Sequence, residues 1–516
     1  MSLLGFSTYA EARRGFHWDQ RWQLFEGDQT RFNIANECLD RHVRAGRGAA
    51  VGARVVRSDG ACDGITFGEL DALASQMALV LRDLGVAHGD RVAVRIEPGR
   101  HYIAAMYAIL RLGAIFVPCT PLLGTDATRA RIIDAAPAVT LVETEADFGG
   151  WLPEGKTLTR AAFLAQAAAR SGRVECAATK PADAAIYIYS SGTTGMPKRT
   201  VLQHQGFTYL TVMVGVLVQG LEPEDRFMSC YNPGYLAGFG WGIIVPMALG
   251  TAAGIAAGRF EAAGFVRAMS EQKITALHCP ATAYRKLLRA YAGEPLSLRK
   301  LAYTAEAMDE ELSRRIHAAF GSYPRGHYGA SEVGMMAIDY AFPDYTVRPG
   351  TVGQPLLGTD IAVVDESGAR LPPGQIGKIA LMRGGKTLYS GDFGVWDADG
   401  YLVFKGRTND VIISSGFTIG AEEIEECLRT HAAVEQAAVI AVPDPDRGHV
   451  AKAFVQLAEP RQYATDAALA TLTATLQDHV RDKLGRYAYP KHIEYVTQFE
   501  LNEAGKIRKA ALRDHQ

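Results

Sequence analysis

The stretch YIYSSGTTGMPKRTVLQHQG, from Tyr187 to Gly206, decides the fold more than any other part of the sequence. The apolar and aromatic residues 186–189 predict a strand, and the Ser/Gly/Thr run 190–195 ends it. Glycines let backbone N–H groups approach an oxyanion closely, hydroxyls add donors, and Lys198 adds a positive charge. The stretch therefore predicts a loop that holds a polyphosphate, with ATP as the first candidate.

The spacing within this loop excludes the Walker A motif, GxxxxGK[ST]. Met196 and Pro197 separate Gly195 from Lys198, and proline blocks the helix that a P-loop NTPase begins directly beneath its phosphates. The remaining alternative is an ordinary surface loop rich in Ser, Gly and Thr. The rest of the chain decides between the two interpretations.

Three further motifs follow this loop in the chain. HYGASE spans His327–Glu332, YSGDFGVWDADGYLVFKGRTNDVI spans Tyr389–Ile412, and NEAGKIRKAALR spans Asn502–Arg513. Together with SSGTTGMPK and the following His204, they resemble the ordered motifs of the AMP-forming adenylating enzymes. That superfamily includes acyl-CoA synthetases, peptide-synthetase adenylation domains and luciferases, and the resemblance is strongest to medium-chain acyl-CoA synthetases. It covers essentially the whole chain.

The fold is predicted to be α/β, with a large multi-layer N-terminal domain and a small mobile α+β C-terminal domain. A chain of 516 residues exceeds what one hydrophobic core usually supports. Apolar residues at helical spacing over 67–84 and a short strand pattern over 91–96 begin an alternation of helices and strands. The pattern and the resemblance predict domains at residues 1–406 and 411–516, joined by a hinge at 407–410.

Composition excludes several other classes of protein. A formal net charge of −2 argues against a nucleic-acid partner bound by bulk charge. The seven cysteines include no CxxC pair, so we expect reduced core residues in a cytoplasmic protein. The N-terminus shows no secretory signal pattern. Residues 227–258 carry no charge, but two prolines and seven glycines interrupt them, so we expect a loop, a buried helix and a buried strand instead of a membrane span.

Adenylation joins a carboxylate to the α-phosphate of ATP, so positive groups and a metal ion must offset the charge that develops at phosphorus. The resemblance implies that Lys506, Lys198 and Glu332 are catalytic, with Lys506 over the α-phosphate and Glu332 holding Mg²⁺. It also implies that Asp392 accepts hydrogen bonds from the ribose and that Arg407 reaches ribose or phosphate. The implied nucleotide site comprises Ser190, Ser191, Gly192, Thr193, Thr194, Gly195, Lys198, Glu306, His327, Tyr328, Gly329, Ala330, Ser331, Asp392 and Arg407.

Lys506 also has a competing interpretation. It is followed by other basic side chains and could belong to a solvated basic tail. The members of that tail would be Lys506, Arg508, Lys509 and Arg513.

In the second half-reaction, the resemblance implies that the C-terminal domain rotates about the hinge and the adenylate reacts with a thiol. Residues 415–417 (Ser415, Gly416 and Phe417) resemble the segment that forms the pantetheine tunnel, and Arg447 and Arg481 match basic positions that contact the phosphates of CoA. Asn409 departs from the Asp or Lys common at the hinge. Thr418 departs from a frequent Arg, so one phosphate contact is in doubt.

The sequence constrains the acceptor of the acyl group less than it constrains the activation of the acid. Free CoA is favoured by the two matching arginines, and a carrier protein's phosphopantetheine is the alternative. A luciferase-like oxidation and a pseudoenzyme that binds nucleotide without turnover are further alternatives. The intact set of Lys198, Glu332, Asp392 and Lys506 disfavours the pseudoenzyme.

The acid is predicted to be apolar and larger than acetate. Residues 227–258 contain no acidic side chain, so the ammonium of an amino-acid substrate would lack a partner. Gly329 stands where the acetate-specific branch of the family has tryptophan. The expected pocket is lined by Tyr235, Leu236, Ala237, Phe239, Trp241, Gly329 and Val333. The sequence thus predicts a cytoplasmic ligase that uses ATP, Mg²⁺ and CoA, with no nucleic-acid partner.

Overall fold

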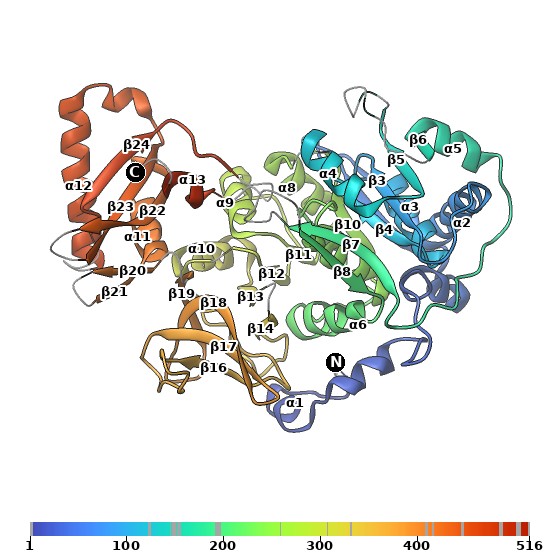
Figure 1. The fold of residues 1–516 in the computed structure, drawn as a ribbon, viewed down its shortest axis with the longest axis horizontal. Helices are drawn as coiled ribbons and strands as arrows, with labels where there is room; N and C mark the ends of the chain where they lie inside the picture. Colours follow the sequence, from blue (N-terminus) through green and yellow to red (C-terminus); the bar gives the residue numbers. More distant parts are fainter. Residues whose placement is uncertain are drawn as a thin grey trace. The chain divides into compact units, whose positions relative to one another are not determined.

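The computed structural model of the chain forms two compact units, and their elements are labelled in Figure 1. The N-terminal unit contains residues 1–327 and 338–349, and the C-terminal unit contains residues 328–337 and 350–516. The structure describes residues 4–121, 125–144, 146, 151, 156–190, 198–258, 260–306, 308–330, 333–407, 411–414, 417–444, 448–484, 489–501 and 507–513. The mixed α/β class is as predicted. Most of the predicted hinge, 408–410, lies outside the described residues, so the division at that point stays a prediction.

The first sheet of the N-terminal unit carries strands β7 and β8, which flank residues 191–197 and which we call the phosphate-loop hairpin. Its pairs are parallel apart from the last, β7–β8, which is antiparallel. Helices α2 (Phe67–Asp83) and α3 (Arg100–Arg111) pack on one another, and α3 packs on two strands of this sheet. In sheet order the strands are β6 (Lys156–Thr159), β5 (Val139–Val142), β3 (Arg91–Arg95), β4 (Ile115–Pro118), β7 (Ala184–Ser190) and β8 (Lys198–Gln203).

The second sheet of this unit is parallel except for its β1–β2 edge. In order, its strands are β13 (Pro324–Ala330), β12 (Lys300–Tyr303), β11 (Ala276–His278), β9 (Phe227–Ser229), β10 (Ala253–Ala256), β1 (Val51–Val56) and β2 (Cys62–Thr66). One hydrophobic core includes residues of both sheets together with α2 and α3, which ties the unit together. The other α-helices of the unit are α1 (Tyr9–Gly15), α4 (Thr125–Ala135), α5 (Arg160–Ala168), α6 (Gly206–Leu210), α7 (Val245–Ala248), α8 (Ala262–Glu271), α9 (Ala281–Ala290) and α10 (Glu310–Phe320).

Local sequence explains where two of these helices begin. The side chain of Thr66 accepts a hydrogen bond from the Glu69 N–H, and the Glu69 carboxylate accepts one from the Thr66 N–H. Asp309 caps α10 by accepting from the Leu312 N–H, and Gly321 ends that helix with a φ of 78°. The predicted helix at 67–84 and strand at 91–96 are therefore confirmed to within one residue at their C-terminal ends.

The uncharged stretch 227–258 folds as the sequence predicts. It contains strand β9, a π-helical segment at Ala237–Ile244, helix α7 and strand β10. In the described part of the chain, no helix combines the length and apolarity needed to cross a bilayer.

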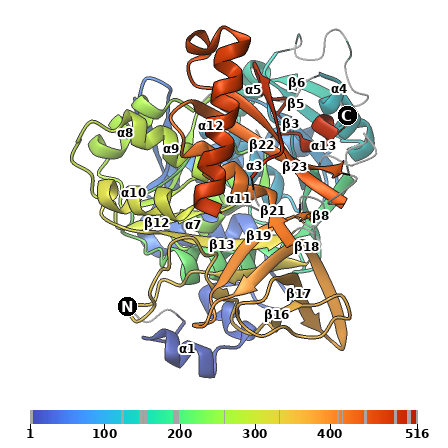
Figure 2. The same ribbon diagram turned by 90° about the vertical axis from the view of Figure 1, so that its left-hand side faces the viewer.

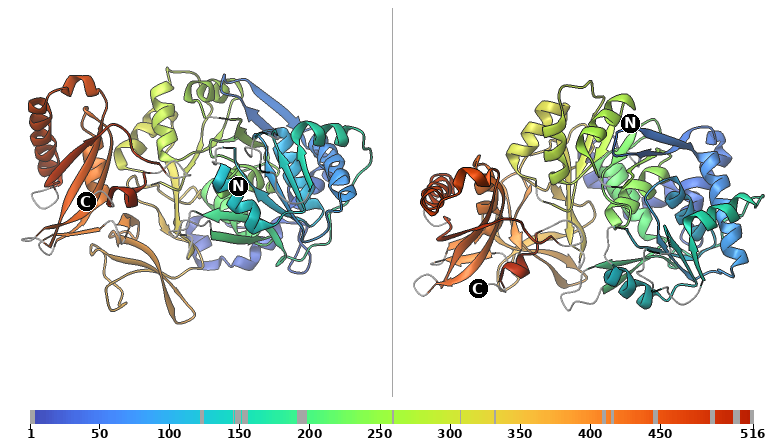
Figure 3. Two further views of the ribbon diagram at one scale, coloured as in Figure 1. Left: turned by 45° about the horizontal axis from the view of Figure 1, so that its top comes forward. Right: turned by 90° about the horizontal axis from the view of Figure 1, so that it is seen from above.

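The C-terminal unit contains two small sheets. The first is antiparallel, in the order β16 (Ile361–Val364), β17 (Gly377–Arg383), β18 (Lys386–Trp396) and β19 (Leu402–Arg407). The second is ordered β21 (Phe417–Gly420), β20 (Val411–Ser414), β23 (Gly448–Leu457) and β22 (Val434–Asp444), with β24 (His492–Val496) paired to β23. Helices α11 (Ala421–Arg429) and α12 (Asp466–Leu484) share one core with this sheet, and α13 (Lys509–Arg513) contacts β22 (Figure 2, Figure 3). Strands β14 (Gly334–Ile338) and β15 (Gln354–Pro355) continue, beyond β13, the sheet that runs from β13 to β2.

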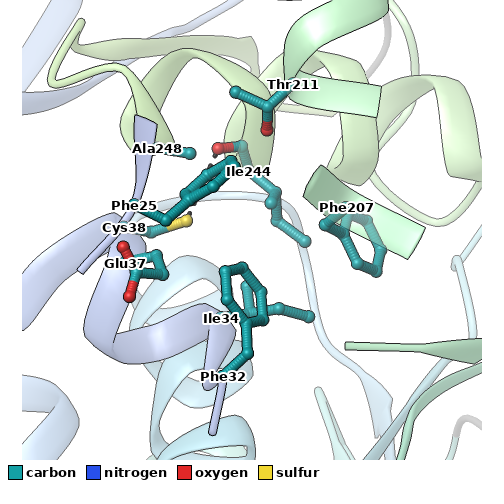
Figure 4. A pocket seen from close by; sticks show the side chains of 9 residues that line it. All are labelled: Phe25, Phe32, Ile34, Glu37, Cys38, Phe207, Thr211, Ile244 and Ala248. Atoms are coloured by element: carbon teal, nitrogen blue, oxygen red, sulfur yellow. Dashed lines mark hydrogen bonds between the residues drawn. The ribbon is translucent and has the colours of Figure 1, made fainter. Parts of the chain in front are cut away.

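A small apolar hollow in the N-terminal unit lies beside Cys38 (Figure 4). It leaves no room for a water molecule, and the Cys38 thiol donates to the carbonyl of Ile244 at 3.5 Å. The hollow is therefore part of the packed core. Its lining consists of Phe25, Phe32, Ile34, Glu37, Cys38, Phe207, Thr211, Ile244 and Ala248.

A buried ion cluster joins α3 to its neighbours. Arg111 is fully buried, and its guanidinium donates to the carboxylates of Asp40 and Asp71 and to the hydroxyl of Ser75. Burial raises the pKa of Asp40, and the charge of Arg111 opposes that shift. The cluster is stable only while both signs of charge are present.

We expect Arg111→Met to lower the free energy of unfolding by about 3–5 kcal/mol, because it leaves Asp40 and Asp71 with only the longer ion pairs to the exposed Arg173, at 3.5 and 3.7 Å. Urea unfolding of both proteins measures the difference. The matched control is Arg314→Met, which breaks an exposed pair with Glu310 and should cost less than about 1 kcal/mol. Equal losses in the two variants would contradict the interpretation.

Candidate active site

The phosphate-loop hairpin has its two ends fixed by strand pairing. Ser190 is the last residue of β7 and lies opposite Lys198, the first residue of β8. Because β7 runs parallel to β4, Ser190 lies at the carboxyl end of the parallel strands, where α/β sheets bind ligands. Lys198 is exposed. The loop residues 191–197 lie outside the described residues, so their contacts stay a prediction.

His204 follows the loop in sequence but belongs to the core. Its side chain is fully buried, and its Nδ1 accepts a hydrogen bond from the Ile34 N–H at 3.3 Å. Burial lowers the pKa of His204 to about 4, so the ring is neutral at physiological pH. This histidine supports the hairpin and adds no positive charge to a phosphate site.

The C-terminal unit brings three of the predicted nucleotide residues together. The Tyr328 hydroxyl donates to Asp392 Oδ2 at 2.6 Å, and Ser390 Oγ accepts from the Asp392 N–H at 3.1 Å. Arg407 lies opposite Asp392 in the pairing of β18 with β19. Asp392 is only 3% exposed, so this aspartate is not the solvated surface residue that an isolated carboxylate usually is.

Backbone geometry explains the glycine of the SGD sequence at this point. Gly391 has a φ of 81°, in the left-handed region that side chains other than glycine rarely adopt. The adjacent part of β18 also shifts register against β19 between Phe393 and Gly394. The kink places Asp392 in a buried position on β18, opposite the last residue of β19.

Glu306 has a defined partner in the N-terminal unit. Its carboxylate accepts from the Thr282 N–H at 2.8 Å and from the Thr282 hydroxyl at 3.0 Å, at the start of α9. The preceding Ala305 has a φ of 70°, which is uncommon for a residue other than glycine and is typical of functional loops. The role of Glu306 in nucleotide binding stays a prediction.

Several predicted residues lie outside the described part of the chain. These are Ser331, Glu332, Ser415, Gly416, Arg447 and Lys506, together with the loop residues Ser191, Gly192, Thr193, Thr194 and Gly195. Of Ser190, Ala330, Arg407 and Phe417, only the backbone is described. Arg481 is half-buried, pairs with Asp478 and lies 4.7 Å from the centre of the Tyr489 ring. No group of three or more His, Cys, Asp or Glu side chains within the described residues could hold a metal ion.

The predicted acid-pocket residues of the N-terminal unit form one continuous turn and helix. Phe239 is fully buried, and Tyr235, Leu236, Ala237 and Trp241 are half-buried. They lead into the π-helical segment Ala237–Ile244, where a Cβ at Gly238 would lie 2.0 Å from the Asn232 carbonyl oxygen. Close backbone packing therefore fixes the direction of these side chains.

Gly329 and Val333 belong to the C-terminal unit. Gly329 is exposed, and a Cβ there would lie 2.6 Å from the carbonyl oxygen of Gly334. A larger residue at 329 would therefore have to shift the neighbouring backbone. The suggestion that this glycine enlarges the acid pocket stays a prediction.

Beside the predicted pocket, the N-terminal unit holds four aromatic side chains that we call the imidazole–indole cluster: Tyr231, Trp241, His278 and His327. His278 is 0% exposed and His327 is 3% exposed, and their Nε2 atoms are 3.1 Å apart. The Trp241 ring stacks on His278, with centroids 5.8 Å apart, and meets His327 edge-on at 4.9 Å. The Tyr231 ring packs edge-on against Trp241 and His278.

Three nitrogens of the cluster are buried without a hydrogen-bond partner among the described residues. They are Trp241 Nε1, His278 Nδ1 and His327 Nδ1. Leaving such an atom unpaired costs about 1–3 kcal/mol, so it needs an explanation. The sequence analysis named Trp241 and His327 but missed His278 and Tyr231. A histidine inside the apolar strand ALHC was the available signal.

A hairpin whose ends, Ser190 and Lys198, lie at the carboxyl edge of an α/β sheet is expected in a nucleotide-binding enzyme, and so is the buried aspartate that accepts from a tyrosine in the C-terminal unit. Comparison with known proteins identifies the family. The model of the AMP-binding enzyme family matches residues 44–390, and that of its C-terminal domain matches residues 423–506. The chain therefore belongs to the AMP-binding enzyme family, as the motifs predicted.

Individual relatives agree with this assignment. The mitochondrial acyl-coenzyme A synthetase ACSM4 of Homo sapiens is 30% identical over 510 residues, covering 87% of this chain and 84% of its own. Benzoate–CoA ligase of Thauera aromatica is 28% identical over 518 residues, covering 94% and 96%. The crystal structure of the anthranilate CoA ligase AuaEII in complex with anthranoyl-AMP has a TM-score of 0.82 at 25% identity, covering 94% and 97%.

The buried histidines predict a loss of stability in mild acid. Burial lowers the pKa of His278 to about 3 and that of His204 to about 4, whereas an unfolded histidine titrates near 6.5. Below about pH 6.5 the unfolded chain therefore binds more protons than the folded one. Each such histidine should remove about 1.4 kcal/mol of stability per pH unit as the pH falls from there towards its folded pKa.

The variant His204→Asn tests this prediction, because asparagine retains an acceptor for the Ile34 N–H and does not titrate. Urea unfolding at about pH 7, 6 and 5 gives the free energy of unfolding as a function of pH. The slope of this dependence should be shallower in the variant by the equivalent of about one proton. An identical slope would mean that His204 is already protonated in the folded protein.

Proposed function

We propose that this enzyme converts ATP and an apolar carboxylic acid larger than acetate into an acyl-adenylate and pyrophosphate. It then transfers the acyl group to CoA and releases AMP. The single observation that carries the proposal is the buried Tyr328–Asp392 hydrogen bond at 2.6 Å, with Arg407 opposite it. These are the side chains that the adenylate-forming motifs assign to the nucleotide.

The Asp392 carboxylate is suited to bind the ribose. It accepts from Tyr328 on one oxygen, and the Ser390 hydroxyl fixes its backbone, so its orientation is set before ATP arrives. A carboxylate accepts hydrogen bonds strongly, and a vicinal diol supplies two donors. Asp392 then holds the nucleoside while the chemistry takes place at the α-phosphate.

The charge that develops at phosphorus needs cations close to it. Lys198, exposed at the end of the phosphate-loop hairpin, is proposed to bind the β- and γ-phosphates. Lys506 is proposed to contact the α-phosphate and the attacking carboxylate. Bound Mg²⁺ would neutralise phosphate charge, with Glu332 as its proposed protein ligand. Glu332 and Lys506 are assigned by their motifs.

The acid is proposed to be apolar in the part next to the half-buried side chains of Tyr235 to Trp241. This segment carries no charge, which disfavours an amino acid. The names of relatives leave the size open, because they include the benzoate–CoA ligase above and an acetyl-coenzyme A synthetase of Bacillus subtilis, 26% identical over 552 residues. The proposed size depends on Gly329 in place of tryptophan.

Free CoA is the proposed acceptor because the relatives above are named as CoA ligases or acyl-CoA synthetases. Arg447 and Arg481 would contact the phosphates of CoA, next to a pantetheine tunnel formed by Ser415, Gly416 and Phe417. A carrier protein's phosphopantetheine is the second candidate.

Product analysis tests the reaction. With ATP, a suitable acid and CoA, we expect AMP, pyrophosphate and an acyl-CoA in equal amounts. ADP and phosphate would contradict adenylation. An adenylate that CoA cannot discharge, but a phosphopantetheinylated carrier protein can, would replace the proposed acceptor.

Two variants separate the half-reactions. Lys506→Ala should slow adenylate formation by about 10²–10³-fold, because it removes a charge from the transition state, yet a supplied acyl-adenylate should still react with CoA. Gly416→Leu should do the reverse by obstructing the tunnel. Acid-dependent ATP–pyrophosphate exchange measures the first step, and thioester formation from synthetic adenylate measures the second.

The control for Lys506 is Arg508→Ala. Arg508 belongs to the same basic run, is exposed and forms only a loose pair with Glu500 at 3.4 Å. If Lys506 is part of a solvated basic tail, the two alanine variants should behave alike. If both Lys506→Ala and Gly416→Leu lose both half-reactions equally while folded, rotation about residues 407–410 is the wrong mechanism.

A further inference from the structure

The imidazole–indole cluster contains more hydrogen-bonding capacity than the protein uses. His278 and His327 use their Nε2 atoms on one another, and the Nδ1 of each, together with Trp241 Nε1, has no partner among the described residues. Both imidazoles are more than nine-tenths buried. Native proteins pair nearly all buried polar atoms, so three open nitrogens in one cluster point to a missing ligand.

The chemistry of the histidine pair fixes which groups it presents. Burial lowers the pKa of His278 to about 3 and that of His327 well below its ordinary value, so both rings are neutral. A hydrogen bond between two Nε2 atoms requires a proton on one and a lone pair on the other. The first ring then has a bare Nδ1 and the second an Nδ1–H. Whichever ring is which, the pair presents one acceptor and one donor.

Strand order places this cluster at the edge of the sheet where α/β proteins bind ligands. His278 is the last residue of β11, and Tyr231 lies two residues beyond the end of β9, at the same carboxyl edge of the parallel sheet. His327 lies on β13, and the Thr304 hydroxyl, just beyond β12, donates to its carbonyl at 2.8 Å. Ligands of α/β sheets bind outside the carboxyl ends of the strands.

Trp241 connects the cluster to the acid pocket. It belongs to the segment assigned above to the acid, and its ring contacts both histidines. A wholly apolar acid would leave the donor, the acceptor and the indole N–H unpaired. The two Nδ1 atoms lie on the far sides of the rings from the Nε2 contact, so one ligand group can reach only one of them. A hydroxyl group both donates and accepts, so it can pair that Nδ1 and the indole N–H together.

We propose that the acid used by this enzyme carries a hydroxyl group on an otherwise apolar body. One histidine of the His278–His327 pair binds this hydroxyl through its Nδ1 together with Trp241, the other histidine fixes the tautomer of the first, and the three side chains determine specificity. This inference rests on the proposed function, because it names the substrate class of the same site. A site built to bond a hydroxyl rejects the analogue that lacks it strongly, whereas an apolar pocket discriminates weakly between the two.

Matched pairs of acids test the proposal with pyrophosphate release as the assay. Suitable pairs are benzoate with meta- or para-hydroxybenzoate, phenylpropanoate with para-hydroxyphenylpropanoate, and hexanoate with ω-hydroxyhexanoate. In at least one pair we expect kcat/KM to favour the hydroxylated acid by about 100-fold. The ratio of kcat/KM values within a pair isolates the effect of the hydroxyl, because both acids carry the same carboxylate.

Three variants show whether the cluster causes the preference. His278→Phe and His327→Phe retain a ring and lose the nitrogens, and each should reduce the preference at least tenfold while the acid without hydroxyl is still used. Trp241→Phe removes the indole N–H together with one of the two fused rings but leaves an aromatic side chain, and it keeps the proposal testable if a histidine variant does not fold. Thermal unfolding identifies the folded variants.

The matched control is His42→Gln. His42 is another buried histidine, whose Nε2 lies 2.8 Å from the carbonyl oxygen of Met247, and a glutamine amide can retain that bond. Because His42 lies outside the cluster, the ratio within each acid pair should stay within about twofold of the wild-type ratio. A loss of preference in this variant as well would attribute the effect to general destabilisation and overturn the proposal.

The remaining outcomes are also decisive. If the protein activates acids but favours no hydroxylated member by more than about tenfold, or if every folded cluster variant retains the preference, water fills the cluster and the inference is wrong while the proposed function stands. If no acid of the panel supports pyrophosphate release, the proposed function itself fails.

Discussion

The parallel pairing of β9, β11, β12 and β13 is the constraint on which the candidate site depends. Parallel strands end at the same edge of a sheet, so residues far apart in sequence meet there. The register sets Ser229 beside His278 and His278 beside Ala302, and Tyr303 beside Gly326. The residues that follow these positions form the imidazole–indole cluster and its hydrogen-bonded support. The Tyr231 hydroxyl donates to the Thr304 carbonyl at 2.9 Å, which links two of the strand ends directly.

The residues proposed for ATP and those next to the proposed acid site differ in charge. Among the residues proposed for ATP, Lys198 and Asp392 are charged: Lys198 is the first residue of β8, and Asp392 lies within β18, opposite the last residue of β19. The residues next to the proposed acid site are uncharged, since burial keeps His278 and His327 neutral. Neutral imidazoles can discriminate hydrogen-bonding groups without attracting the carboxylate that must remain at the α-phosphate.

The histidines illustrate how far sequence reasoning reached and where it stopped. His204 follows the loop motif and His327 begins HYGASE, and the sequence analysis placed His327 in the implied nucleotide site. The structure puts His204 in the core, where it accepts from the Ile34 N–H, and pairs the His327 ring with His278. Spacing along a strand or loop predicts local conformation, but the partner of a side chain comes from another strand. His278 was missed because a single histidine in an apolar strand signals a buried polar group but does not name its partner.

The sequence by itself determined the family, helix α2, strand β3 and the strand that precedes the phosphate loop. These follow from local properties: apolar periodicity, the inability of Ser, Gly and Thr runs to continue a strand, and an ordered set of motifs. Helix α2 and strand β3 fall where their patterns predict, and β7 ends at Ser190. Only the tertiary structure decided that Tyr328 bonds Asp392, that Arg111 joins two buried carboxylates, and that Trp241 lies against two neutral histidines. Each of these contacts joins residues that are distant in sequence, so each depends on sheet register and packing, which are properties of the folded chain as a whole.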